Sequence, residues 1–273
     1  MGLLQCRFFS DILQTNTSIT VTIPEVTRLP EFHQLGAGKR VQFPVMYVLH
    51  GGTDDSTYWM RKTRIEEYGQ RYGFMTVSLD AFSSCYSNMV HGYRYFDFLT
   101  EELPRFVEGM FPASTEREDR IIAGFSMGGQ GTLKAAFLRP EQYGAAMPLC
   151  GARDIVSLFE KWESMENGPD LTAARNALGP IGELRGSVHD LVHLARAAGA
   201  YKEKLPPLFV ACANDDYAAE LTEEYHQLLC EVGIEHTYFK APGIHDYYFV
   251  DRTLKYVLDN WLKLRGPRLK EDA

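Results

Sequence analysis

The hydrophobic pattern of this 273-residue chain predicts buried strands that alternate with helices. Apolar runs of the kind expected from strands covered on both faces of a sheet lie at residues 43–49, 74–79, 120–125, 145–150, 208–212 and 235–240. Helical patterns lie at residues 65–72, 96–109, 129–139, 218–232 and 246–264. This order predicts an α/β fold with a mostly parallel central sheet and helices on both faces.

Two segments depart from this alternation. Near the N-terminus, residues 7–13 and 18–24 are β-like and are separated by the polar stretch 14–17, which predicts an antiparallel hairpin at a sheet edge. Residues 154–204 contain helical fragments interrupted by glycine and proline, with no evident strand. We expect a small helical insertion over the carboxyl ends of the strands, where open α/β sheets bind ligands. Residues 1–273 are expected to form a single domain.

Composition then excludes several classes of partner. The chain is 45% hydrophobic and 23% charged, which is ordinary for a globular protein, and no apolar run is long enough to span a bilayer. The net charge of −8 without a concentrated basic patch argues against nucleic acid. The first residues lack the basic region, apolar core and cleavage site of a secretory signal, which favours a cytoplasmic protein.

Metal-ligating residue types are scattered along the chain. The five cysteines are odd in number and form no Cys-x-x-Cys pair, so neither a disulfide framework nor a zinc site is indicated. His189 and His193 are four residues apart, but no third ligand accompanies them, and we expect both on the surface of a helix at residues 188–198. No metal and no organic cofactor are expected.

The most informative motif is Gly-Phe-Ser-Met-Gly at residues 124–128, between the apolar run 120–125 and the predicted helix 129–139. This is the arrangement of a nucleophile elbow, in which small glycines allow a sharp strand-to-helix turn that exposes the serine hydroxyl. The helix N-terminus also favours the negative charge that develops when a carbonyl is attacked. Ser126 is the candidate nucleophile, although a glycine-rich turn with Ser126 as helix N-cap has the same pattern.

A serine nucleophile needs a histidine base that is oriented by an acidic residue. In α/β hydrolases the acidic residue and then the histidine follow the serine along the chain. Here Asp215 and Asp216 stand just beyond the run 208–212, and His245 follows the predicted strand 235–240. Both acidic residues fit this order, so the pattern alone leaves Asp215 open beside Asp216.

The loop after the run 43–49 contains candidate donors for an oxyanion hole. It reads His50-Gly51-Gly52, and glycines allow the backbone to approach a substrate oxygen. We predict that the backbone N–H groups of Gly52 and Met127 bind the oxyanion, since losing one such donor typically lowers turnover by about 10²–10³-fold. Taken alone, this segment is more typical of a plain turn.

With these residues assembled, the chain resembles the esterase D-type family of α/β hydrolases over nearly its whole length. The resemblance is closest to the branch of tributyrin, feruloyl and acetyl esterases, and it rests on residues 48–52, 95–104, 122–129 and 243–247. It implies the α/β-hydrolase fold and a serine carboxylesterase that hydrolyses short-chain or aromatic acyl esters through an acyl-enzyme. In that branch the acidic segment reads Cys-Gly-x-x-Asp, which selects Asp216 for the triad with Ser126 and His245.

The chain also departs from its family. The Leu-Ser-Gly-Leu-Thr-Cys segment of S-formylglutathione hydrolases is absent, so a glutathione thioester is a less expected substrate. A tyrosine follows the His-Asp pair where relatives often have tryptophan, and residues 80–89 correspond to a family loop near the acyl site, although that loop could equally be packed under its own aromatic side chains. The residues expected to contribute to substrate binding are His50, Gly51, Tyr86, His91 and Tyr247.

Three other functions remain open at this point. An acyltransferase would use the same residues with an alcohol or sugar in place of water, and a thioesterase resembling S-formylglutathione hydrolase would use them on a thioester. A non-catalytic binding protein would have lost a triad member, and here every candidate is present. The expected partner is a small-molecule ester, including one linked to a carbohydrate, and a homo-oligomer is a family-level expectation only.

Overall fold

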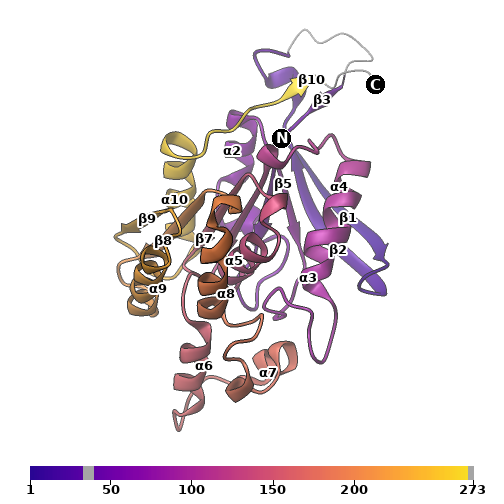
Figure 1. The fold of residues 1–273 in the computed structure, drawn as a ribbon. Coiled ribbons are helices and arrows are strands. Elements are labelled where there is room, and N and C mark those ends of the chain that lie inside the picture. Colours follow the sequence, from indigo (N-terminus) through magenta and orange to yellow (C-terminus); the bar gives the residue numbers. More distant parts are fainter. Residues whose placement is uncertain (33–39, 270–273) are drawn as a thin grey trace.

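One eight-stranded sheet organises residues 1–32 and 40–269, which are the residues that the computed structural model describes (Figure 1). The strand order is β1-β2-β5-β4-β6-β7-β8-β9. From β5 to β9 in this order, neighbouring strands are parallel, whereas β2 pairs antiparallel with both β1 and β5. The predicted mostly parallel sheet is confirmed. The strands are β1 (Gly2–Ser10), β2 (Thr15–Ile23), β4 (Val45–Leu49), β5 (Met75–Leu79), β6 (Arg120–Phe125), β7 (Ala145–Leu149), β8 (Leu208–Ala213) and β9 (His236–Ala241).

Helices cover both faces of this sheet because successive side chains of each strand point to opposite sides. Val45 and Tyr47 of β4 belong to a core shared with α4, α5, α8 and α9, whereas Met46 and Val48 belong to a core shared with α1, α2 and α10. The helices are α1 (Tyr58–Lys62), α2 (Ile65–Tyr72), α3 (Tyr95–Asp97), α4 (Leu103–Met110), α5 (Met127–Leu138), α6 (Ile155–Glu163), α7 (Thr172–Leu178), α8 (Leu191–Ala198), α9 (Ala219–Glu231) and α10 (Tyr247–Asn260).

The helix predicted at residues 96–109 is interrupted. It consists of α3, a π-helical turn at Phe98–Glu102 and then α4. Pro104 stands in the first turn of α4 and has no N–H to donate to the preceding turn, which accounts for the change in helical geometry. A short ribbon of β3 (Val41–Gln42) and β10 (Arg268–Leu269) was not predicted, because two-residue strands carry no periodic signal.

The N-terminal antiparallel hairpin is confirmed, but its first strand was placed too late. β1 begins at Gly2 and ends at Ser10, so the turn comes at residues 11–14 rather than 14–17. Most of β1 is exposed, and its neighbour is β2 on one side only. An exposed edge strand is held by backbone pairing rather than by alternating apolar residues, and a hydrophobic pattern therefore locates it poorly.

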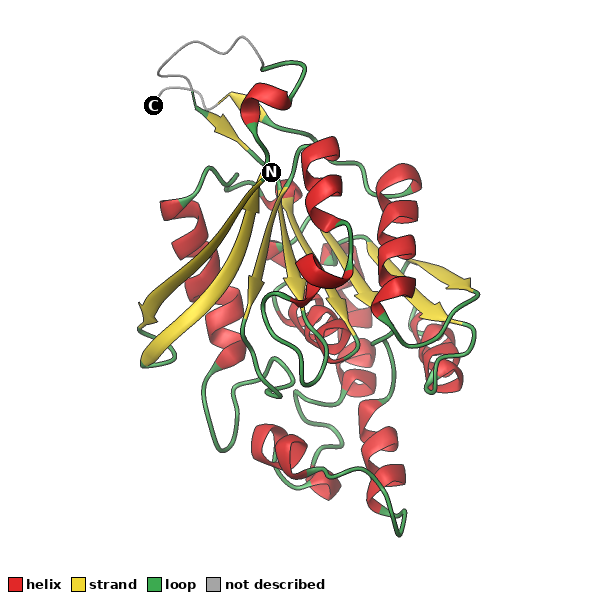
Figure 2. Ribbon diagram, turned by 180° about the vertical axis from the view of Figure 1, so that it is seen from behind, coloured by secondary structure: helices red, strands yellow, loops and turns green. Residues whose placement is uncertain are grey.

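The insertion between β7 and β8 lies beyond the carboxyl ends of the strands, as expected. Figure 2 shows two of its helices, α6 and α7 of Figure 1, below the arrowheads of the central sheet. Its first part, with α6 and α7, has a core of its own that includes Val156, Leu158 and Leu178. α8 instead packs on α5 and on the main core. The insertion thus extends from the carboxyl ends of the strands through α6 and α7, while α8 returns to the main core.

Candidate active site

Ser126 occupies the sharp turn between β6 and α5. Its backbone has φ 54° and ψ −114°, a conformation that side-chain-bearing residues rarely adopt and that functional sites retain. Two glycines make this turn sterically feasible. A Cβ on Gly124 would lie 2.0 Å from the carbonyl oxygen of Gly128, and a Cβ on Gly128 would lie 2.2 Å from that of Leu49. The two glycines of the motif are therefore needed because a side chain at either position would collide with the backbone, as the sequence pattern indicated.

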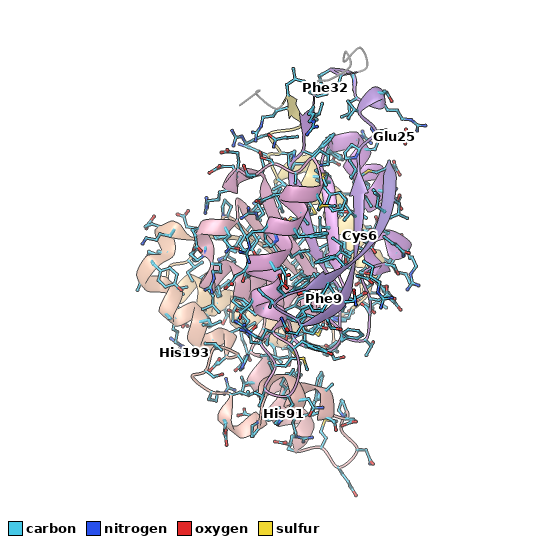
Figure 3. The ribbon with its side chains drawn as sticks, turned by 90° about the vertical axis from the view of Figure 1, so that its right-hand side faces the viewer. Cys6, Phe9, Glu25, Phe32, His91 and His193 are labelled. Carbon is cyan, nitrogen blue, oxygen red and sulfur yellow. The ribbon has the colours of Figure 1, made fainter. Side chains whose placement is uncertain are left out.

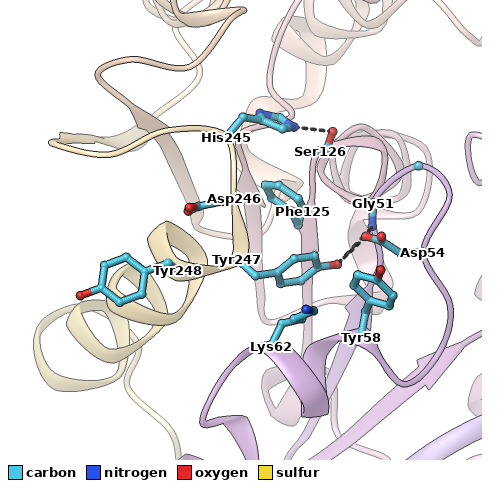
Figure 4. Close-up of a pocket in the computed structure, with 11 residues that line it drawn as sticks. Gly51, Asp54, Tyr58, Lys62, Phe125, Ser126, His245, Asp246, Tyr247 and Tyr248 are labelled. Carbon is cyan, nitrogen blue, oxygen red and sulfur yellow. Dashed lines mark hydrogen bonds between the residues drawn. The ribbon is translucent and has the colours of Figure 1, made fainter.

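The structure brings Ser126, His245 and Asp216 together from three different loops. His245 Nε2 lies 2.8 Å from Ser126 Oγ (Figure 4). On the other side of the ring, His245 Nδ1 lies 2.6 Å from Asp216 Oδ2. With its proton on Nδ1, the imidazole donates to the carboxylate and accepts from the serine hydroxyl. Asp215, the open alternative, is exposed, and its N–H donates to the carbonyl of Gly243 at 3.0 Å. Among the described residues, the carboxylate that pairs with the histidine ring is that of Asp216.

The Asp216 carboxylate is ionised at neutral pH. Burial alone raises the pKa of this group, but the hydrogen bond and charge of His245, the N–H of Ala218 and the charge of Arg153 together hold the pKa below its ordinary value. Asp216 Oδ1 accepts from Ala218 N at 2.9 Å. An ionised, anchored carboxylate is the arrangement that fixes a histidine tautomer.

Arg153 is a residue at this site that the sequence did not reveal. It lies in the loop after β7, and only 1% of its side chain is exposed. Its Nη2 lies 3.5 Å from Ser126 Oγ and its Nη1 lies 3.9 Å from Asp216 Oδ1, while the guanidinium stacks over Tyr217 at 5.2 Å. The available signal was positional: an arginine in a loop at the carboxyl end of a buried strand, beside the strands that carry the triad.

Two backbone N–H groups are available near Ser126. Among the described residues, those of Gly52 and Met127 donate to no protein acceptor, Met127 being the first residue of α5. The N–H of Gly51, in contrast, donates to Asp54 Oδ2 at 3.1 Å and to the Tyr247 hydroxyl oxygen at 3.3 Å. The glycine loop is thus held by Gly51, while Gly52 is exposed.

A pocket of about 530 Å³ opens in front of Ser126 and His245. Tyr247 forms one wall, where its hydroxyl donates to Asp54 Oδ2 at 2.9 Å (Figure 4). Burial and the nearby Asp54 carboxylate hold the pKa of Tyr247 far above its ordinary value, so this hydroxyl remains a donor. The lining is rich in aromatic and charged groups: Gly51, Gly52, Asp54, Tyr58, Lys62, Phe125, Ser126, His245, Asp246, Tyr247 and Tyr248.

Three residues expected at the substrate lie away from this pocket. His50 is fully buried, and its Nε2 accepts from Ala81 N at 3.0 Å. Tyr86 is also fully buried, and its hydroxyl donates to the carbonyl of His50 at 3.1 Å. His91 is exposed beside the insertion, where its N–H donates to Asn176 O at 2.9 Å (Figure 3). His50 and Tyr86 therefore lie in the protein interior, where their hydrogen bonds hold the start of the glycine loop at residues 50–52.

The prediction that His189 and His193 share a helix surface is wrong for His189. α8 begins at Leu191, because Asp190 caps it by accepting from the N–H groups of two residues in its first turn. His189 lies before the helix, where its Nδ1 is 2.9 Å from the Nζ of the buried Lys134. His193 is on the exposed surface of α8 (Figure 3).

Within residues 1–32 and 40–269, two groups of three side chains are spaced closely enough to hold a metal ion. One is Cys150, Asp216 and His245, whose imidazole and carboxylate are already engaged with each other and with Ser126. The other is His226, Cys230 and His236, which lies apart from the pocket. Among the described helices, none is long and apolar enough to cross a membrane.

Known proteins resemble the chain over nearly its whole length. Residues 15–248 match the family described as putative esterase. The acetyl esterase of Caldicellulosiruptor saccharolyticus is 26% identical over 251 residues, which cover 91% of this chain and 94% of that protein.

Solved structures give the same picture. The fluorophosphonate-binding serine hydrolase FphF of Staphylococcus aureus is 26% identical with a TM-score of 0.84, covering 96% of this chain and 98% of that one. The S-formylglutathione hydrolase FrmB of the same organism is 26% identical with a TM-score of 0.81, covering 96% and 99%. The predicted α/β-hydrolase fold is confirmed, and the chain is a carboxylic ester hydrolase that belongs to the putative esterase family.

Proposed function

We propose that the protein hydrolyses small carboxylic esters through an acyl-enzyme formed on Ser126. The observation that carries this proposal is the 2.8 Å contact between Ser126 Oγ and His245 Nε2 at the mouth of a pocket of about 530 Å³. His245 takes the hydroxyl proton as Ser126 attacks the ester carbonyl, and it returns that proton to the leaving alcohol. Asp216 keeps the imidazole in the required tautomer.

The oxyanion of each tetrahedral intermediate is bound by the N–H groups of Gly52 and Met127. A Cβ on Gly52 would meet no atom within 4 Å, so a substrate oxygen has room to approach this backbone. Met127 contributes the first N–H of α5, where the positive end of the helix dipole favours negative charge. A water activated by His245 then attacks the acyl-enzyme and releases the acid, with no metal or organic cofactor in the reaction.

The pocket favours short-chain acyl and aromatic acyl groups such as acetyl, butyryl and feruloyl. Phe125 and Tyr247 have ring centroids 4.6 Å apart, and Tyr58 lies 5.7 Å from Tyr247, so one wall is a continuous aromatic surface. Asp54 and Lys62 also line the pocket and supply polar contacts for a sugar or another hydroxylated alcohol. Relatives described as an acetyl esterase and as a ferulic acid esterase act on acyl groups of these two kinds.

Two alternative reactions use the same groups. Transfer of the acyl group to an alcohol replaces only the final water, and hydrolysis of a thioester replaces only the leaving group. The similarity to an S-formylglutathione hydrolase favours testing the second, although the family's oxyanion segment for that substrate is absent here.

Covalent labelling with an alkyl phosphonate tests the nucleophile. The expected result is a mass shift on the peptide that contains Ser126, with complete loss of labelling and of ester hydrolysis in Ser126→Ala. Ser164→Ala, which changes an exposed serine at the end of α6, should behave as the parent protein. Ester hydrolysis that survives Ser126→Ala would contradict the mechanism. A panel of acetyl, butyryl and feruloyl esters, the S-formylglutathione thioester and competing alcohol acceptors then defines the reaction.

A further inference from the structure

A second group of side chains with metal-ligating chemistry lies where α9 meets the edge of the sheet. His226 and Cys230 are one turn apart on α9, and His236 is the first residue of β9. His226 Nδ1 lies 2.7 Å from His236 Nε2 and 3.9 Å from Cys230 Sγ. All three ligand atoms lie within 4.8 Å of one another.

The two imidazoles are already oriented for a shared ligand. His236 Nδ1 lies 2.8 Å from the carbonyl oxygen of Ile234, to which it donates, so the lone pair of its Nε2 faces the cluster. A backbone carbonyl on the remote nitrogen is how proteins commonly orient a metal-bound histidine. The ring of His226 is stacked on Tyr238 with centroids 4.2 Å apart and planes 13° from parallel, which restricts its rotation.

We propose that His226, Cys230 and His236 form a zinc site. Two imidazole nitrogens and one thiolate suit Zn²⁺, whereas Mg²⁺ and Ca²⁺ require oxygen ligands. Zinc bonds of about 2.0–2.3 Å at tetrahedral angles separate two nitrogens by about 3.3 Å and a nitrogen and a sulfur by about 3.6 Å. The distances of 2.7 and 3.9 Å thus lie within about 0.6 Å of these values, and side-chain rotations can supply the difference.

Binding of the ion requires a specific redistribution of protons. Without metal, the short contact between the imidazoles is a hydrogen bond from His226 Nδ1 to His236 Nε2. When Zn²⁺ binds, the proton of His226 moves from Nδ1 to Nε2 and the Cys230 thiol releases its proton to solvent. Cys230 is exposed, so the ion can enter from solvent and a water can complete the fourth position.

The position of the cluster indicates a structural role. His236 stands at the start of β9, and the strand runs through five further residues at about 3.3 Å each before the loop that carries His245. The zinc site is therefore at the opposite end of the sheet from the triad. It links the last turn of α9, where the helix dipole favours a cation, to an edge strand that pairs with β8 on one side only.

Zinc titration of the chelator-treated, reduced protein tests this proposal. We expect one Zn²⁺ per chain by calorimetry, a concentration-dependent rise in Tm, and thiolate-to-metal charge-transfer bands when Co²⁺ replaces Zn²⁺. Loss of a residue that only hydrogen-bonds to a metal ligand weakens metal binding by roughly 10–100-fold. Cys230→Ser and His236→Gln each remove a ligand itself, so each should weaken zinc binding by more than this. Cys230→Ser should also abolish the charge-transfer bands.

Matched controls are available on the same chain. Cys6→Ser changes a half-buried cysteine of β1, and His193→Gln changes an exposed histidine of α8, so both should bind zinc as the parent does. The proposal fails if the parent binds no Zn²⁺, or if Cys230→Ser and His236→Gln bind it with unchanged affinity. None of these readouts uses ester hydrolysis, so the result is independent of the proposed function.

Discussion

Lys134 is a buried cation whose cost to stability can be tested through pH. The residue is only 5% exposed, and its Nζ lies 2.6 Å from Ser87 Oγ and 2.9 Å from His189 Nδ1. Both partners are uncharged, because burial, together with the charge of Lys134, lowers the pKa of His189 to about 4. Burial lowers the pKa of Lys134 itself from 10.5 to about 8. We therefore choose Lys134→Met as the perturbation, since methionine is unbranched and only one atom shorter than lysine, and it removes the charge.

The expected magnitude follows from this change in pKa. A fall from 10.5 to about 8, at 1.36 kcal/mol for each pH unit, corresponds to a penalty of about 3 kcal/mol on the folded state below pH 8. Above pH 8 the folded protein releases this proton while the unfolded chain retains it until about pH 10.5, so the penalty declines over this interval. The free energy of unfolding of the parent should therefore rise relative to Lys134→Met as pH increases from 8 to 10.

Urea denaturation followed by circular dichroism at pH 7, 8, 9 and 10 measures this difference. Lys134→Met should be more stable than the parent at pH 7 by up to about 3 kcal/mol, less the value of the hydrogen bonds lost, and its advantage should shrink by about 2 kcal/mol at pH 10. Lys161→Met, at an exposed lysine of α6, provides the control with a constant difference. A Lys134→Met difference that is equally constant would refute the reasoning, because it would mean that Lys134 titrates alike in both states.

Three further substitutions test the candidate site. Asp216→Asn should lower kcat by about 10⁴-fold by favouring the wrong imidazole tautomer, whereas Asp215→Asn, at an exposed carboxylate, should stay within about threefold of the parent in the same ester assay. Arg153→Met removes the guanidinium that lies beside Ser126 Oγ and the Asp216 carboxylate. Since hydrogen bonds to charged groups contribute about 1.5–3 kcal/mol, kcat should fall by about 10–100-fold with little change in KM. An unchanged kcat would exclude a contribution of Arg153 to the reaction. Gly128→Ala places a Cβ 2.2 Å from a backbone carbonyl oxygen of β4 and should lower Tm or prevent folding, while Gly109→Ala, with no atom within 4 Å of its Cβ, should leave Tm unchanged or raise it.

The sequence predicted the fold best where the signal is local. The interior strands and the long helices have strong patterns because burial on a sheet or helix face constrains every residue of the element. The start of β1 and the two strands of the β3–β10 ribbon lack such constraint, and the turn at Phe98–Glu102 depends on one proline within an otherwise helical pattern.

The residues of the candidate site likewise differ in whether a local motif in the sequence identifies them. Ser126 and His245 stand in short motifs whose glycines and flanking strands are visible in the chain, and the structure brings their side chains into contact. Arg153 and the cluster of His226, Cys230 and His236 had no such motif. Each depends on how separate elements pack, since an arginine after one strand reaches the ends of two others and one histidine of the cluster comes from a neighbouring strand.

The strands that carry the triad differ in how firmly they are held. β6 lies in the middle of the sheet and five of its six residues are buried, whereas β9 is an edge strand and none of its residues is fully buried. Local opening of a folded protein begins at such weakly packed elements. Ser126 thus follows a strand in the well-packed centre of the sheet, whereas His245 follows an edge strand that can open before the central strands do. We therefore expect heat to inactivate this enzyme by local opening at β9, at temperatures where the central strands are still folded.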